Sequence, residues 1–192
     1  MNYFFYTKFR SLFLIFCVLN VILLASCAPA APSGPRDQCG FIEPTQQDVN
    51  KVLSFGGDTF SSTNWVKSYT VEPYKVTLTR HNDADSAVAY IEYLIYTCGY
   101  TQADMDAYFS EEGFAIVFDE YESYTETAFC EIESLALYQF DAVDEGANYD
   151  VNYWVEQTDD NHMLVMMLVF PKGSPQLVEY SAKLFPKLTG CQ

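Results

Sequence analysis

Hydrophobic and polar residues follow two periods along this chain, and the period of two that is typical of strands dominates the second half. Residues 148–157 alternate apolar and polar side chains, and residues 163–170 are apolar throughout, as in a central strand covered on both faces. Residues 114–118 form a short apolar run. Residues 127–140 place one apolar set on a common face, namely Cys130, Ile132, Ala136, Tyr138 and Phe140. These four segments predict an antiparallel meander.

A smaller hairpin is predicted before the meander. Residues 65–71 and 74–80 are rich in β-branched and aromatic residues, which favour strands. Between them stand Glu72 and Pro73, which suit a turn.

Helical spacing predicts a long helix over residues 84–98. Asn82 or Asp83 would cap its first turn and Gly99 would end it. Its apolar residues recur every three or four positions, at Ala84, Ala87, Val88, Ile91, Leu94, Ile95 and Cys98.

Shorter helices are predicted from Thr45 to Gly56, over 102–109 and over 175–185, the last with Ser174 as its cap and a proline at its first position. The expected fold class is therefore α+β. It consists of an antiparallel sheet, made of a four-strand meander plus a smaller hairpin, with helices packed on it and two disulfides.

The first 26 residues have the layout of an export signal. Lys8 and Arg10 give a basic start without an acidic residue, and an apolar run of 15 residues follows at 11–25. A helix that spans the bilayer core needs about 20 apolar residues, so this run is short for a membrane span. A basic start, an apolar centre and small residues at the end are typical of a signal peptide.

The residues Leu24, Ala25, Ser26 and Cys27 resemble the lipobox of bacterial lipoproteins. In that family the cysteine sulfur receives a diacylglycerol, the signal is cut just before it, and the new amino terminus is often acylated. The resemblance implies that Cys27 is the first residue of the mature chain and its lipid anchor. It also implies an extracytoplasmic protein, anchored to the cell membrane, or to the outer membrane if the cell has one.

Two other interpretations of this segment stay open. Ordinary signal cleavage after Ala30 has a small-x-small site, and an uncleaved anchor is the second alternative. The lipoprotein interpretation divides the chain into a signal peptide at 1–26, a lipidated cysteine with a Pro/Ala tether at 27–38, and a single acidic domain at 39–192.

The charge of the chain is strongly negative and unevenly distributed. The formal net charge is −16, and without Lys8 and Arg10 it becomes −18. The 91 residues between Arg80 and Lys172 contain no lysine or arginine, while residues 83–160 contain 20 aspartates and glutamates. Such a surface repels phosphate backbones, which excludes nucleic acid as a partner. It attracts Ca²⁺ or a basic partner, or it serves as a solvated coat that keeps the domain soluble.

Cysteine usage predicts two disulfides. With Cys17 in the signal and Cys27 lipidated, four cysteines remain, and an even number in an exported domain indicates pairing. We expect Cys98, on the inner stripe of the predicted helix, to join Cys130. We expect Cys39 to join Cys191, because the two ends of a domain often lie close together. No pair has the CxxC spacing of a zinc site.

The search for catalytic chemistry is mostly negative. The sequence contains no GxSxG elbow, no GxxxxGK[ST] loop, no GxGxxG turn and no HExxH motif. His81 stands near Asp83 and Asp85 and is either an acid–base or metal group or part of the start of the predicted helix. His162 opens the apolar strand and is expected to be structural. We therefore expect no catalytic residue, no metal site and no cofactor.

Carboxylates are abundant enough to leave two weaker hypotheses open. A pair of them can act as acid and base in glycan cleavage, but a sequence does not give their separation. The turns at 119–122 and 159–160 carry several carboxylates that could bind Ca²⁺ weakly, with a solvated turn as the alternative.

Aromatic residues supply the candidate binding surface. Tyr90 and Tyr93 would project away from the buried stripe of the predicted helix, with Tyr96 at its flank, and Trp154 lies on the polar face of its strand. Exposed rings stack on sugars or anchor peptides, unless another layer of the protein covers them.

The sequence as a whole predicts a membrane-anchored lipoprotein whose acidic domain binds a protein or glycan partner in the cell envelope. The alternatives are a carboxylate-dependent envelope hydrolase and a purely structural or spacer protein. A pocket with converging carboxylates and a histidine would favour the enzyme, and a broad aromatic patch would favour binding.

Overall fold

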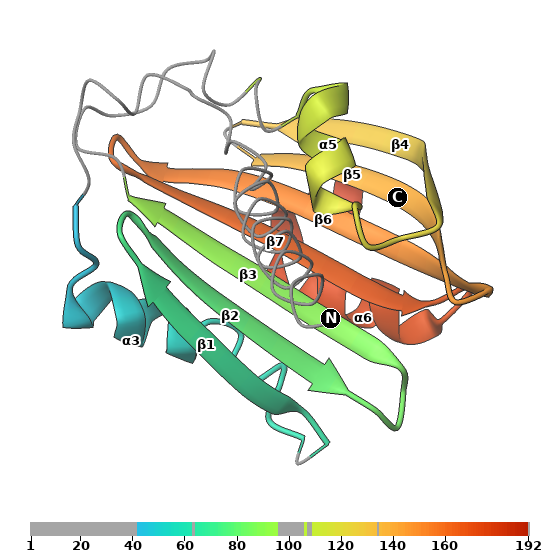
Figure 1. Ribbon diagram of the computed structural model, residues 1–192, viewed down its shortest axis with the longest axis horizontal. Coiled ribbons are helices and arrows are strands. Elements are labelled where there is room, and N and C mark those ends of the chain that lie inside the picture. Colours follow the sequence, from blue (N-terminus) through green and yellow to red (C-terminus); the bar gives the residue numbers. More distant parts are fainter. Residues whose placement is uncertain (1–41, 63, 96–105, 107–108, 134, 192) are drawn as a thin grey trace, which may run out of the picture. The chain divides into compact units, whose positions relative to one another are not determined.

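One antiparallel sheet organises the fold. The computed structural model describes residues 42–62, 64–95, 106, 109–133 and 135–191, which belong to the second of two compact units, Gly34–Gln192. Seven strands lie in the order β1-β2-β3-β7-β6-β5-β4 (Figure 1). Their bounds are β1 (Val66–Glu72), β2 (Lys75–Asn82), β3 (Ala87–Ile95), β4 (Ser123–Ile132), β5 (Leu135–Asp144), β6 (Ala147–Asp159) and β7 (His162–Pro171).

The sheet consists of two meanders joined edge to edge. Strands β1 to β3 form the first meander and β4 to β7 the second, so most neighbours in the sheet are also neighbours in sequence. The non-local pair is β3 with β7, which are antiparallel from Val88 opposite Val169 to Ile95 opposite His162. This pairing places the two meanders in one continuous sheet.

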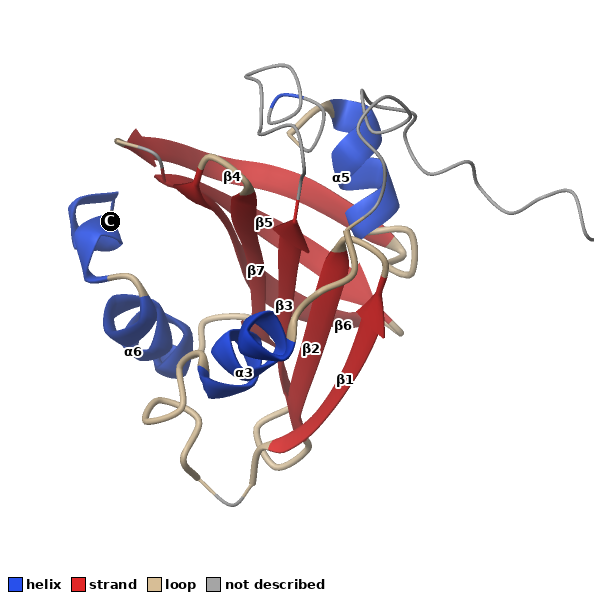
Figure 2. Cartoon of the chain, turned by 90° about the vertical axis from the view of Figure 1, so that its left-hand side faces the viewer, coloured by secondary structure: helices blue, strands red, loops and turns tan. Residues whose placement is uncertain are grey.

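The first face of the sheet is covered by α3 (Gln46–Ser54), α6 (Pro175–Leu184) and the 3-10 helix η1 (Pro186–Cys191) (Figure 2). Their buried residues, Val49, Val52, Leu177, Phe185 and Leu188, share one apolar cluster with the sheet. Helix α3 begins with a capping box, in which Thr45 and Asp48 each bond the other's backbone N–H.

The second face carries α5 (Glu111–Val117), on the opposite side of the sheet from α3 and α6 (Figure 2). Phe114, near its middle, and Phe118, at its end, are buried four positions apart against Phe140 of β5. The rings of Tyr124, Tyr138 and Tyr153 pack around these phenylalanines, so the part of the core beneath α5 is mainly aromatic.

Several predicted elements are confirmed. The hairpin at 65–71 and 74–80 is present as β1 and β2, and the strands at 148–157 and 163–170 are present as β6 and β7. The helices predicted from Thr45 and over 175–185 are α3 and α6. The helix predicted over 102–109 lies largely outside the described residues.

The helix predicted over 84–98 is wrong, because residues 87–95 form strand β3. The strand lies between β2 and β7, with one face buried and the other mostly half-buried, so its apolar residues fit a period of two as well as a helical period. Asn82 caps no helix. Its side chain accepts hydrogen bonds from the backbone N–H groups of Ala84 and Asp85 in the β2–β3 turn.

Two strand predictions in the second half are also wrong. Residues 114–118 belong to α5 or its end, where Ser110 caps the helix by accepting from the Gly113 N–H. Residues 127–140 are not one strand but parts of β4 and β5, separated by a turn in which Glu133 has a positive φ of 55°. The expected four-strand meander plus a smaller hairpin is therefore replaced by a seven-stranded sheet with three α-helices among the described residues.

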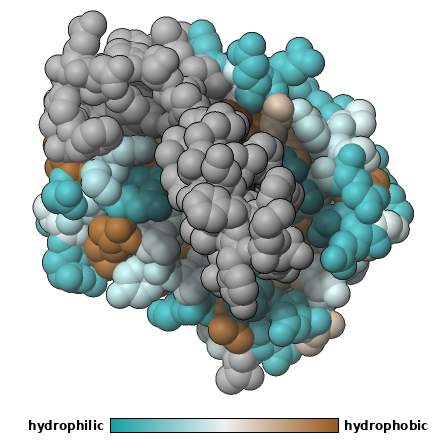
Figure 3. Space-filling view, viewed as in Figure 1, coloured by the Kyte–Doolittle hydropathy of each residue, from teal (hydrophilic) through white to brown (hydrophobic). Residues whose placement is uncertain are grey.

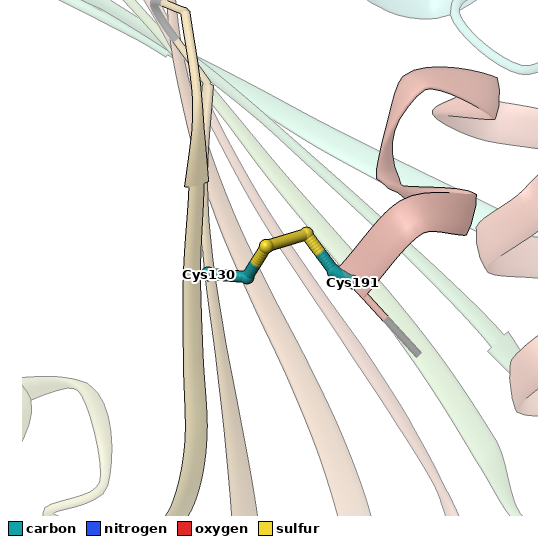
Figure 4. Close-up of a disulfide and its surroundings, with 2 residues drawn as sticks. All are labelled: Cys130 and Cys191. Carbon is teal, nitrogen blue, oxygen red and sulfur yellow. A yellow bond between two sulfur atoms is a disulfide. The ribbon is translucent and has the colours of Figure 1, made fainter.

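The observed disulfide corrects both expected pairings. Cys130 of β4 is bonded to Cys191 at the end of η1, with Cα atoms 5.7 Å apart (Figure 4). The C-terminal segment packs against β4, so Cys191 is not available to Cys39, nor Cys130 to Cys98. Cys39 and Cys98 lie outside the described residues, and one disulfide is present within them instead of the two expected.

Removing the disulfide should destabilise the domain. The bridge spans a sequence separation of 61 residues. Restricting a loop of that length in the unfolded chain is worth about 4 kcal/mol. Cys130→Ser and Cys191→Ser should each lower the free energy of unfolding by a similar amount in denaturant titrations, and the double variant should be no less stable than either single one. Peptide mapping without reductant provides the direct check, and a Cys39–Cys191 or Cys98–Cys130 peptide would contradict the structure.

Candidate functional site

Two of the four expected binding aromatics are core residues. Trp154 is 1% exposed and packs against Phe185 at the end of α6, with ring centroids 5.0 Å apart. Tyr93 is 2% exposed and faces α3, where it accepts a hydrogen bond of 2.7 Å from Nζ of Lys51. The layer formed by α3 and α6 therefore covers residues that the sequence interpretation left on the surface.

The expected aromatic surface is not formed by the described residues. Tyr90 is half-buried on the second face, the face opposite Tyr93 and Trp154, and it donates a hydrogen bond of 2.7 Å to Glu92. Tyr96 lies outside the described residues. Because β3 is a strand, Tyr90 and Tyr93 point to opposite faces, whereas a helix would have placed them side by side.

His162 belongs to a cluster that fixes α3 on the sheet. Its ring stacks on Tyr93 with centroids 5.2 Å apart, and its Nδ1 lies 2.6 Å from Asp159. Partial burial opposes ionisation of Asp159, but the Asn161 N–H and His162 outweigh it and lower the pKa of this carboxyl. The groups in this cluster are bonded to one another, which is typical of a structural role.

Neither a metal site nor a membrane span is found in the part of the chain that the structure describes. No group of three or more histidine, cysteine, aspartate or glutamate residues is arranged there to hold a metal ion. No described helix is long and apolar enough to cross a bilayer.

A pocket of about 310 Å³ lies at one end of the sheet, at the margin of the second face. The turn between β2 and β3, the connection from α5 to β4 and the ends of β5 and β6 converge there (Figure 1). Its apolar part is formed by Val88 and Val169, which are paired across β3 and β7. Its polar lining includes His81, Asp83, Ser86, Tyr121, Asp144 and Tyr149.

The polar lining has no partners within the protein. None of those six side chains makes a hydrogen bond or an ion pair with another residue in the described ranges. Asn82, which also lines the pocket, differs because it is fully engaged in the β2–β3 turn and donates a hydrogen bond of 2.7 Å to Asp85. Asp83 and Ser86 are exposed, whereas His81, Tyr121, Asp144 and Tyr149 are half-buried, so these four are partly enclosed, unpaired groups that are available to a ligand.

Tyr121 is a half-buried titratable group in the pocket lining. Burial raises the pKa of its phenol to about 12, and the negative charge of Asp144 acts in the same direction. Tyr121 therefore stays neutral at physiological pH. As a residue of the pocket lining it carries a hydroxyl group and an aromatic ring, and the ring also contacts Phe118.

The residues that line the pocket include carboxylates but no lysine or arginine. All of its lining residues lie between positions 81 and 169, within the 91-residue stretch that contains no lysine or arginine. Asp83 and Asp144 line it directly. The surface over the α5–β4 connection and the β5–β6 turn is mostly hydrophilic on the right of Figure 3, and acidic residues in these segments are Asp119, Glu120, Glu122 and Glu145.

Sequence reasoning identified only one side of this pocket. The sequence predicts His81, beside Asp83 and Asp85, as an acid–base or metal group, with a helix start as the alternative; the pocket contains His81 and Asp83, while Asp85 bonds to Asn82. Tyr121, Asp144 and Tyr149 were missed, because they come from segments that meet His81 only through the β3–β7 pairing. The stretch without basic residues was the one signal in the sequence that covers the whole lining.

Comparisons with known proteins assign no family to the chain. No protein-family model matches it, and no curated protein matches it. Among solved structures, human STARD10 matches with a TM-score of 0.28 and 12% sequence identity, over 81% of this chain and 80% of that one. A likeness at this level assigns neither a fold family nor a function.

Tyr121→Phe should change the alkaline titration of the protein. Tyrosine in an unfolded chain ionises near pH 10, so the raised pKa of Tyr121 contributes stability that is complete below pH 10 and is lost as pH rises through about 12. In the phenolate absorbance titration the variant should lose part of the component near pH 12, to which Tyr138 also contributes. Tyr69→Phe, at an exposed position, should leave that component intact; an unchanged component in Tyr121→Phe would contradict this assignment.

Proposed function

We propose that this chain is an extracytoplasmic lipoprotein, held to the membrane through Cys27, whose acidic domain binds a protein or glycan partner of the cell envelope. The lipobox-like ending of the signal supports the anchor. The pocket at the end of the sheet supports binding, and the observation that carries the proposal is its set of polar side chains without internal partners.

The size and lining of the pocket suit one small group of a larger partner. Ligand pockets for small molecules range from about 300 to 1,000 Å³, and this one lies at the lower end. That volume fits a single sugar unit or one amino-acid side chain. Tyr121 and Tyr149 supply rings that stack on either kind of group, and the carboxylates of Asp83 and Asp144 accept hydrogen bonds from it.

Carboxylate-dependent hydrolysis is the second candidate function. His81 and two aspartates line the same pocket, which is the combination that acid–base chemistry needs. However, His81 makes no hydrogen bond to either carboxylate, so the described residues contain no oriented acid–base pair in this pocket. Release of cleaved glycan or peptide from envelope material by the wild type, but not by Asp144→Asn, would favour the enzyme.

The anchor can be tested by intact-mass spectrometry of the protein extracted from its native membrane. The chain should begin at Cys27 and carry the mass of a diacylglycerol, with or without a third acyl chain. Cys27→Ala should remove the modification and shift the protein from the membrane to the soluble fraction. A chain that still begins at Met1, or one that begins at Ala31, would contradict the lipoprotein proposal.

Binding can be tested by co-sedimentation of the detergent-solubilised mature protein with purified envelope fragments. Asp144→Asn and Tyr149→Ala should each weaken sedimentation about tenfold, which corresponds to about 1.4 kcal/mol. Val178→Ala, an exposed position on α6 across the sheet, should sediment like the wild type. Thermal unfolding shows whether each variant is folded. Equal sedimentation of folded pocket variants and wild type would place any binding outside the pocket.

A further inference from the structure

We propose that the group held in this pocket is an organic cation, an ammonium or guanidinium group, placed against the rings of Tyr121 and Tyr149 with Asp83 and Asp144 as its counter-charges. This inference rests on the proposed binding function and names the chemistry of the ligand. The same group can come from a free amine or from a lysine or arginine side chain of a protein partner.

Charge is the first argument for a cation. Asp83 and Asp144 line the pocket and neither forms an ion pair with a described residue. An anionic ligand would be repelled by both, and a neutral one would leave both without a counter-charge. The negative charge of the surrounding 91-residue stretch adds a field that concentrates cations near the opening.

The basic side chains near the pocket, Lys172 and Arg80, already have partners within the protein. Lys172 is paired with Asp141 and Asp150. Arg80, which precedes His81, points to the first face, where its guanidinium donates to the backbone carbonyls of Leu53 and Phe55. A cation that pairs with Asp83 and Asp144 would therefore come from outside the described part of the chain.

The aromatic lining is the second argument. A cation over a tyrosine ring is attracted by the negative face of the ring, and the attraction increases when water is partly excluded. Tyr121 remains neutral at physiological pH and its hydroxyl has no internal partner. In a small pocket, the two tyrosine rings would contact the apolar side of an ammonium group, and the two carboxylates would accept hydrogen bonds from its N–H groups.

Matched small probes test the charge requirement. Butylammonium has the length of a lysine side chain, and butanol is its neutral counterpart of nearly the same size. In calorimetric or NMR titrations of the mature protein, butylammonium should bind and butanol should bind at least tenfold more weakly. Asp144→Asn should weaken butylammonium binding about tenfold, whereas Glu131→Gln, the same change at an exposed position on β4, should not. Raising the salt concentration should weaken binding in the wild type.

A spectroscopic readout links binding to this pocket. A cation beside Tyr121 stabilises its phenolate, so saturating butylguanidinium, which stays charged at the pH where Tyr121 ionises, should lower that pH, and the shift should be absent in Tyr121→Phe. A trilysine peptide and butylguanidinium extend the series. Tighter binding of trilysine than of butylammonium would assign the cation to a basic protein segment, and equal binding would assign it to a free amine.

Two outcomes overturn the inference and separate it from the proposed function. If N-acetylglucosamine or another neutral sugar binds at the pocket while butylammonium does not, the cation proposal fails and glycan binding stands. If no probe binds and the pocket variants sediment with the envelope like the wild type, both proposals fail together.

Discussion

The pairing of β3 with β7 is the interaction on which the rest of the structure depends. All other strand pairs are local hairpins, and two separate meanders would each expose a long apolar edge. Strand β7 has eight consecutive buried residues, each of which contributes about 1.5–3 kcal/mol when it leaves water. That burial requires the first meander on one side of β7 and the second on the other. The burial of β7 therefore depends in part on contacts between residues more than 65 positions apart.

Sequence patterns predicted most elements that are defined by their own alternation, caps and turns. They failed for β3, whose neighbours in the sheet are set by the long-range pairing with β7. Strands β1, β2, β6 and β7 and helices α3 and α6 were found from alternation, caps and turn residues. Strand β3 was assigned to a helix because Val88, Ile91 and Leu94 also fit a helical stripe, and only its two neighbours in the sheet decide between the periods. Helix α5 was missed because its apolar run is short, and the turn at Glu133 because it lacks a clear turn residue.

Long-range strand pairing also decided which residues form the candidate site. The four aromatics chosen from the sequence depended on the helical interpretation of 84–98, so the strand in its place separated Tyr90 from Tyr93 and α6 covered Trp154. The pocket that replaces them is assembled from four segments between residues 81 and 169, and no spacing rule connects them. Composition was the better guide. The stretch of 91 residues without a basic side chain contains every residue that lines the pocket, including Asp83 and Asp144.

The two edges of the sheet differ in a way that limits how molecules can associate. Strand β4 has an irregular register between Glu126 and Ala128 and is tied through Cys130 to the C-terminal segment, and both features hinder the docking of another strand. Strand β1 is regular, and all seven of its residues are exposed. An added strand therefore meets fewer obstacles at β1 than at β4. A pair of sheets joined through β1 is favoured over a longer array, which would also have to use β4.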